Sequence, residues 1–299
     1  MEILSIRNLE KRFADKAVLT GLSLSVPEHS VFGFIGRNGA GKTTTMKLIL
    51  GLLRADGGEI RVCGERVSYG ETRTNRHIGY LPDVPEFYSY MTAPEYLRFT
   101  GEIAGMPRGE CEARSRELLS LVGLLGERHR IRGFSRGMKQ RLGIAGALLG
   151  RPKLLICDEP TSALDPVGRR EILDLLSSVR RETTVLLSTH ILSDVERICT
   201  DVVILDGGQA RLAGSPADLR AGHRSEGYRL EVADDGEALA ILSAFPAVER
   251  SSAGRLSFSA GELAVPELLR FMADRGIAPL RLEREEPTLE ALFMEVARK

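Results

Sequence analysis

The sequence predicts an α/β fold in two domains, a larger one built on a β-sheet with buried parallel strands and a small C-terminal α+β domain. Three observations lead to this prediction. At residues 31–50 an apolar run ends in a glycine-rich loop that turns at once into a helical pattern. Further apolar runs of strand length occur at residues 153–158, 184–187 and 202–205, as expected for buried parallel strands. After residue 219 a polar stretch precedes a second series of short strands and helices, and a chain of 299 residues is long enough for two domains.

The glycine-rich loop fills the pattern G-x-x-x-x-G-K-[ST]. Its residues, with the threonine that follows, are Gly36, Arg37, Asn38, Gly39, Ala40, Gly41, Lys42, Thr43 and Thr44. The glycines let the backbone pass close to an anion, and the N–H groups of the loop and helix N-terminus can cradle a polyphosphate. Lys42 adds a mobile positive charge for the β- and γ-phosphates, and Thr43 offers a hydroxyl to Mg²⁺. The loop therefore predicts a binding site for a nucleoside triphosphate with Mg²⁺.

Composition narrows the class of protein. With 41 basic and 41 acidic residues, the net charge of zero gives no overall attraction to nucleic acid or anionic lipid. We expect neither a signal peptide nor a membrane span, because the N-terminus lacks a basic, apolar leader and no stretch approaches about 18 apolar residues. The four cysteines are far apart, without metal-ligand spacing, and are expected to be reduced cytosolic thiols: Cys63, Cys111, Cys157 and Cys199.

The N-terminal segment predicts a small antiparallel sheet. Residues Glu2 to Asn8 and Ala17 to Val26 alternate apolar and polar side chains, as half-buried strands do. A polar turn, Lys11 to Lys16, is expected between them, and turn residues flank another strand at Glu59 to Val62. Phe13 in the turn is either a plain loop anchor or an exposed ring that stacks on adenine.

The middle of the chain predicts a helical insertion. A short strand, His77 to Leu81, ends at a proline and is followed by Asp83. Apolar residues then fall at helical spacings from Thr92 to Arg130, so we place the insertion at about residues 92–150. The aromatic segment Phe87 to Met91 precedes it, and core packing and a docking surface for a partner explain this segment equally well.

Two acidic residues close the apolar run at 153–158. A parallel strand delivers the residues at its C-terminal end to the nucleotide edge of the sheet, so Asp158 is placed to hold Mg²⁺, through water. Glu159 can accept a proton from an attacking water. The alternative is that both acids cap a helix. After the strand at 184–187, His190 is either structural or able to reach a γ-phosphate.

A further segment carries a family resemblance. Phe134 to Arg141, just before a helix and shortly before the Asp158–Glu159 strand, resembles the signature segment of ATP-binding cassette (ABC) ATPases. Other matches follow in the family's order: Phe13 to the adenine-stacking aromatic, Asp158 and Glu159 to the Walker B end, Asp165 to the D-loop, and His190 to the switch histidine. The resemblance covers about residues 1–220. It implies a P-loop ABC ATPase cassette there, with a mixed sheet core, an antiparallel β subdomain and the helical insertion.

The signature segment departs from the family's commonest form. The residues implied to contact a nucleotide bound by the partner cassette are Ser135, Arg136, Gly137 and Met138. Phe134, Arg136 and Met138 stand where Leu, Gly and Gln are commonest, but Ser135 and Gly137, which meet phosphate in the family, are kept. Asp83 stands where the family usually has Gln. We expect Asp83 to ligate the metal with Thr43 and Asp158; the alternative is that it turns away and links the cassette to a permease.

The resemblance also implies partners. In the family, two cassettes face each other head to tail, so a second copy of the chain is expected, together with a separately encoded transmembrane permease. A basic cluster near the signature is a pattern also seen in nucleic-acid sites, but zero net charge and the signature context favour the nucleotide interface and solvated faces, so no nucleic acid is expected. Its residues are Arg128, Arg130, Arg132, Arg136, Lys139 and Arg141.

Past Leu219 a polar, glycine-containing linker, Arg220 to Gly227, leads to an accessory α+β domain at residues 228–299. Its pattern is strand, helix, two strands, helix and strand, which is the ferredoxin-like order. A last amphipathic helix follows. It carries Leu289, Leu292, Phe293 and Val296 on one face. The domain is either a packing or dimerising appendage or a regulatory ligand site. Its tail resembles those of single-cassette subunits of bacterial drug and antibiotic exporters.

The function implied is that of an ATPase subunit that dimerises on ATP and drives a permease, an exporter. Such a subunit is cytoplasmic and lies on the cytoplasmic face of the membrane through its permease. The alternative is a soluble ABC protein of translation or DNA repair. Those proteins usually carry two cassettes per chain or a long coiled-coil insertion, and this sequence shows neither.

Overall fold

The computed structural model describes residues 2–14, 16–71, 73–222, 227–252, 254–259, 263–284 and 288–298. The chain divides into two compact units: Met1–Pro216 with Val296–Lys299, and Ala217–Glu295. Residues 223–226 of the predicted linker and residues 286–287 of the tail lie outside the described residues.

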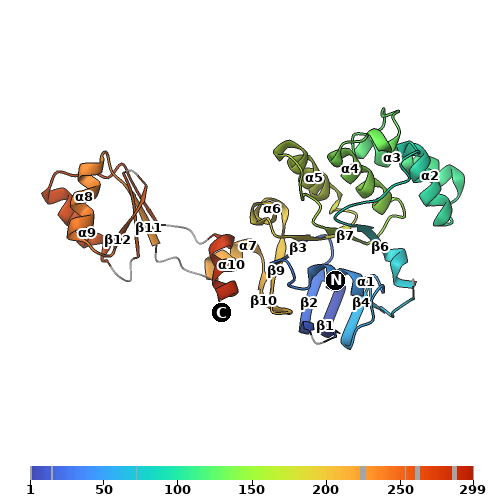
Figure 1. The fold of residues 1–299 in the computed structure, drawn as a ribbon, viewed down its shortest axis with the longest axis horizontal. Helices are drawn as coiled ribbons and strands as arrows, with labels where there is room; N and C mark the ends of the chain where they lie inside the picture. Colours follow the sequence, from blue (N-terminus) through green and yellow to red (C-terminus); the bar gives the residue numbers. More distant parts are fainter. Residues whose placement is uncertain are drawn as a thin grey trace. The chain divides into compact units, whose positions relative to one another are not determined.

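An antiparallel sheet forms the start of the first unit (Figure 1). Its strand order is β2-β1-β4-β5, and its strands are β1 (Glu2–Phe13), β2 (Lys16–Pro27), β4 (Gly57–Val62) and β5 (Glu65–Arg66). The expected antiparallel pairing is present, but β1 is longer than predicted. Lys11 and Arg12, which the sequence placed in the turn, pair with Leu19 and Ala17. The polar side chains of Lys11 and Arg12 are of types common in turns, although the backbone of both residues is extended and paired.

A six-stranded sheet of order β10-β9-β3-β8-β7-β6 is the centre of the first unit. Its strands are β3 (Val31–Gly36), β6 (Ile78–Leu81), β7 (Leu154–Asp158), β8 (Thr184–Thr189), β9 (Asp201–Asp206) and β10 (Gln209–Gly214). The pairings among β9, β3, β8, β7 and β6 are parallel, and β10 is antiparallel to β9. Parallel strands end at the same edge, so the residues after β3, β7 and β8 meet there.

Helices cover this sheet. The ones that follow its strands are α1 (Lys42–Ile49), α5 (Pro166–Val179) and α6 (Leu192–Ile198). The insertion contributes α2 (Ala93–Ile103), α3 (Arg108–Leu121) and α4 (Arg136–Leu148), with a short 3-10 turn at Ile131–Gly133. Another short 3-10 turn, Arg73–His77, precedes β6. Helix α2 starts at a capping box in which Thr92 and Glu95 bond each other reciprocally.

The central sheet separates two hydrophobic cores. One contains Leu97 of α2, Leu118 of α3 and Leu155 of β7, and the other contains Leu4 of β1 and Ile156 of β7. Neighbouring residues of β7 therefore face opposite cores, and every residue of this strand is buried. Packing on both faces fixes the strand ends where the predicted site residues lie.

The second unit contains a four-stranded antiparallel sheet of order β12-β13-β11-β14. In chain order its elements are β11 (Gly227–Glu231), α8 (Asp235–Ala244), β12 (Val248–Ser252), β13 (Arg255–Ser259), α9 (Val265–Asp274) and β14 (Arg281–Arg284). Its core includes Leu230, Ile241, Leu256 and Leu268. Helices α7 (Pro216–Gly222) and α10 (Leu289–Arg298) flank these elements in the chain, and α10 buries Leu289 and Leu292.

Within the described ranges, the structure has no helix with the length and apolar character needed to cross a bilayer.

Candidate ATPase site

The glycine-rich loop wraps tightly between β3 and α1. Gly39 and Gly41 have φ angles of 86° and 104°, in the left-handed region that favours glycine. A Cβ on Gly41 would lie 2.7 Å from Leu19 Cδ2, so Leu19 would have to shift to admit a side chain there. The loop residues Arg37, Asn38 and Gly39 are exposed, and the N-terminus of α1 follows at Lys42. This geometry leaves loop backbone open to an anion.

Lys42 is buried within this loop. Its Nζ donates to the carbonyl of Gly36 at 2.6 Å and lies 3.3 Å from Glu159 Oε1. The side chain is only 6% exposed. A cation beside the open loop backbone is suited to binding a polyphosphate. On binding, Lys42 would replace its contacts with Gly36 and Glu159 by contacts with phosphate oxygens.

Thr43 and Asp158 lie together, as the sequence predicts for two groups that share a metal. Thr43 Oγ1 donates to Asp158 Oδ2 at 2.9 Å, and Ser188 Oγ donates to Asp158 Oδ1 at 2.5 Å. Carboxylate and hydroxyl oxygens are the ligands that Mg²⁺ prefers, so this pair fits the ion. The sequence prediction missed Ser188, which pairs with Asp158 in the sheet. The usable signal was its position directly after the predicted strand at 184–187.

Glu159 lies between Lys42 and His190. Its Oε2 is 2.9 Å from His190 Nδ1, and its backbone N–H donates to Ser188 Oγ at 3.0 Å. Glu159 has a φ of 46°, a left-handed conformation that costs energy in a non-glycine residue and is typical of functional sites. The carboxylate is thus fixed next to Lys42 on one side and His190 on the other, where it can take a proton.

Asp83 is placed elsewhere. Its Oδ1 accepts a hydrogen bond from Ser162 Oγ at 2.7 Å and lies 3.7 Å from the Arg136 guanidinium. Among the described residues, no group of three His, Cys, Asp or Glu side chains lies close enough to hold a metal, so Asp83 is not clustered with Asp158 and Glu159. The assignment of Asp83 as a metal ligand stays a prediction, and the structure does not bring it to Thr43 and Asp158.

The signature segment begins helix α4. Ser135 is the N-cap residue, and its hydroxyl accepts from the N–H of Met138 at 3.2 Å. Arg136 donates to Ser162 Oγ at 3.2 Å. A Cβ on Gly137 would meet only Leu164 Cδ2, at 4.0 Å, so the surface at Gly137 is open. These residues do not contact Lys42, Thr43 or Glu159 in the described hydrogen bonds and ion pairs.

The D-loop residue Asp165 is the N-cap of α5, where its carboxylate accepts from the N–H of Gly168 at 3.2 Å. Phe13 lies at the end of the β1–β2 hairpin and is 45% exposed, with Lys11 Nζ 5.2 Å from the ring centroid. Both residues remain available to a ligand or a partner.

The four cysteines are free thiols. Burial raises the pKa of Cys199 to about 12 and also raises the pKa of Cys157. Both therefore stay protonated and unreactive at neutral pH, and neither takes part in the site.

A glycine-rich loop at the start of a helix, a lysine inside it and two acids at the end of a parallel strand of the same sheet are typical of a P-loop nucleoside triphosphatase. Comparison with known proteins gives the family. Residues 19–162 match the family model described as ABC transporter, and residues 214–297 match ATP-binding protein DrrA1-3-like, C-terminal domain. The chain belongs to the family of ABC transporter ATP-binding proteins, and it is an ATPase.

Three relatives illustrate the similarity. The chain is 37% identical to the uncharacterized ABC transporter ATP-binding protein YxlF of Bacillus subtilis, over 98% of this chain and 99% of that protein. It is 33% identical to the bacitracin transport ATP-binding protein BcrA of Bacillus licheniformis, over 98% and 97%. Among solved structures, an ATP binding subunit of an ABC transporter matches with a TM-score of 0.66 and 34% identity, covering 74% of this chain and 92% of that one.

Proposed function

We propose that the protein is an ATP-driven subunit of an exporter, which dimerises on ATP and acts on a separately encoded membrane permease. The observation that carries the proposal is the position of Glu159, held between Lys42 and His190. An acid fixed there can take the proton of a water that attacks the γ-phosphate.

In this mechanism Lys42 leaves the carbonyl of Gly36 and pairs with the β- and γ-phosphates, while the loop N–H groups hold the remaining phosphate oxygens. Thr43 and Asp158 would hold Mg²⁺, which would neutralise charge on the phosphates. His190 holds the carboxylate of Glu159 in place. We also assign His190 to the γ-phosphate, as the family resemblance implies for the switch histidine. Phe13 stacks on adenine from the end of its hairpin.

Dimerisation completes the site. Ser135, Gly137 and the N-terminus of α4 are open, and in one cassette they make no described contact with the Lys42 loop. We assign them to the γ-phosphate held by a second copy, with Asp165 at the same interface. A helix N-terminus is suited to an anion, since its N–H groups and dipole favour negative charge.

A permease docks on the helical insertion. A cleft of about 640 Å³ lies between the edge strand β6 and helices α2 and α4, and Tyr80, Phe87, Tyr96 and Met106 are among its lining residues. Burial raises the pKa of Tyr80 to about 12, so this ring stays neutral at physiological pH.

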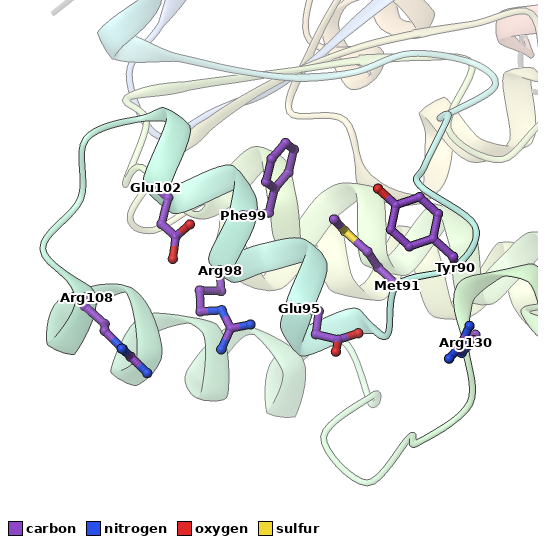
Figure 2. Close-up of a pocket in the computed structure, with 8 residues that line it drawn as sticks. All are labelled: Tyr90, Met91, Glu95, Arg98, Phe99, Glu102, Arg108 and Arg130. Atoms are coloured by element: carbon purple, nitrogen blue, oxygen red, sulfur yellow. The ribbon is translucent and has the colours of Figure 1, made fainter.

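On the other side of α2, a cavity of about 500 Å³ is lined by Tyr90 and by charged side chains (Figure 2). Figure 2 shows these charged residues along α2, at the start of α3 and on the facing loop: Glu95, Arg98, Glu102, Arg108 and Arg130.

Export is the direction proposed, because relatives similar over nearly their whole length are named for bacitracin transport and for linearmycin resistance. A protein bound to such a permease lies on the cytoplasmic face of the membrane. The same relatives favour this function over a role in translation or DNA repair. We assign residues 1–220 to the nucleotide-binding domain and residues 228–299 to an accessory ferredoxin-like domain.

The test is to purify the tagged chain from its own cells in mild detergent and identify the proteins bound to it. We expect an integral membrane protein, lost in Tyr90→Glu and retained in Tyr69→Glu. The two tyrosines are similarly exposed, at 59% and 63%, but Tyr69 lies outside both the cleft and the cavity. Ribosomes or DNA in place of a membrane protein would contradict the proposal.

A further inference from the structure

The hairpin that carries Phe13 extends beyond its sheet. Strand β1 pairs with β2 as far as Phe13 and Lys16, but its register with β4 ends at Glu10 and Gly57. The last residues of β1 therefore have a strand neighbour on one side only. On the other side, the carboxylate of a residue just before β4, Asp56, takes the place of a strand.

The carboxylate of Asp56 contacts the hairpin twice. Its Oδ2 accepts the backbone N–H of Arg12 at 2.6 Å, and its Oδ1 accepts from Lys11 Nζ at 3.0 Å. The backbone N–H of Asp56 in turn donates to the carbonyl of Glu10 at 3.0 Å. The bond from Arg12 and the contact with Lys11 hold the pKa of Asp56 below its ordinary value, so the carboxylate is ionised at neutral pH. Both contacts are made to residues directly before Phe13.

Lys11 links Asp56 to the ring of Phe13. Its side chain is only 11% exposed, and its ammonium lies 5.2 Å from the centroid of the Phe13 ring, a cation–π geometry. One face of the ring is therefore in contact with protein, whereas Phe13 is 45% exposed. A ring fixed on one face is prepared to stack a planar base on the other, because less conformational entropy is lost on binding.

We propose that Asp56 is a positioning residue for nucleotide binding: it fixes Arg12 and Lys11 so that Phe13 presents its ring to adenine. The proposal rests on adenine stacking by Phe13 as given above. If Asp56 has this role, the ratio of the affinity for ATP to the affinity for tripolyphosphate depends on the Asp56 carboxylate, which lies outside the glycine-rich loop. Exposed ion pairs contribute little to stability, so replacing Asp56, whose side chain is 41% exposed, should leave the fold intact.

The test compares MgATP with inorganic tripolyphosphate, which offers the same phosphate groups without a base. Equilibrium dissociation constants are measured for the wild type and for Phe13→Ala, Asp56→Ala, Asp56→Asn and the double variant Phe13→Ala with Asp56→Ala. The matched control is Asp235→Ala in the second unit, because Asp235 also accepts from an arginine and a backbone N–H, those of Arg250 and Gly254.

We expect Phe13→Ala to weaken ATP binding about fivefold or more, the loss typical of one base–aromatic stack. Asp56→Ala should weaken it about threefold or more, and Asp56→Asn, which keeps an acceptor for the N–H of Arg12, should lie between Asp56→Ala and wild type. Tripolyphosphate should bind all variants within about twofold of wild type, and Asp56→Ala should add nothing in the Phe13→Ala background.

Three outcomes overturn the inference: unchanged ATP affinity in Asp56→Ala, an equal loss for ATP and tripolyphosphate in both Asp56 variants, or a full further loss in the double variant. Failure of the stacking assignment gives a different result, since Phe13→Ala itself would then bind ATP like the wild type.

Discussion

Single residues carry the phosphate chemistry, and Lys42 is the first of them. Its ammonium is held by the Gly36 carbonyl and Glu159 and is the cation nearest the loop backbone among the described contacts. We predict that Lys42→Ala weakens ATP binding roughly 10- to 100-fold, the loss expected for a hydrogen bond to a charged group. Titration of ATP into the variant measures this. ATP hydrolysis at the wild-type rate would show that the site is misassigned.

A second prediction about a single residue tests whether Asp83 is a ligand of Mg²⁺. If it ligates Mg²⁺ during turnover, Asp83→Ala should raise the Mg²⁺ concentration for half-maximal ATPase activity roughly tenfold, and Asp83→Gln should restore most of the rate. The contacts with Ser162 and Arg136 favour the opposite result. Activity measured against Mg²⁺ for the three proteins decides between them, and an alanine curve that overlays wild type would remove Asp83 from the metal site.

Contacts between residues at the C-terminal ends of strands could be predicted from the sequence, because parallel strands end at the same edge of the sheet. The contact between Thr43 and Asp158 follows from a P-loop and an acidic strand end. The contacts of Asp83 could not be predicted in this way, because Ser162 lies in the turn after β7 and Arg136 begins helix α4, and the sequence pattern gives no distance between these two elements.

Elements as a whole were predicted more securely than their ends. The buried strands have uninterrupted apolar runs, so β3, β7 and β8 stand where the sequence places them. The β1–β2 hairpin was predicted too short, because the lysine and arginine of its last residues, Lys11 and Arg12, are residue types common in turns, while backbone pairing continues to Phe13 and Lys16.

The first turn of α4 offers a prediction at the scale of the element. A methyl group on Gly137 meets nothing closer than Leu164 Cδ2 at 4.0 Å, so Gly137→Ala should fold and gain up to about 1 kcal/mol of helix stability. ATPase activity should nevertheless fall about tenfold or more, because in the proposed dimer the methyl group would face the nucleotide of the second copy and displace its hydrogen bonds.

Thermal melting and steady-state ATPase assays check both halves of this prediction. Gly79→Ala is the contrasting variant, since its Cβ would lie 2.2 Å from the carbonyl of Ala147 and should destabilise the fold. Wild-type activity in a folded Gly137→Ala protein would remove the start of α4 from the nucleotide interface.

Across the whole molecule, every predicted nucleotide contact lies before residue 217, in the first compact unit. We predict that a chain ending at Leu219 binds ATP within about twofold of the full-length affinity, because it retains every residue assigned to the nucleotide. Titration of ATP into the truncated chain, with circular dichroism to establish that it is folded, tests this. A large loss of affinity in a folded truncation would show that the second unit shares the site.

The central claim is that ATP binding joins two copies of the chain and that Glu159 then releases them by hydrolysis. Glu159→Gln keeps the shape of the side chain but loses the proton acceptor, which should lower hydrolysis about 100-fold or more. The direct measurement is the mass of this variant by size-exclusion chromatography with light scattering, in ATP and in ADP. The account predicts a dimer in ATP and a monomer in ADP. A variant that stays monomeric in ATP and still hydrolyses it would contradict the account.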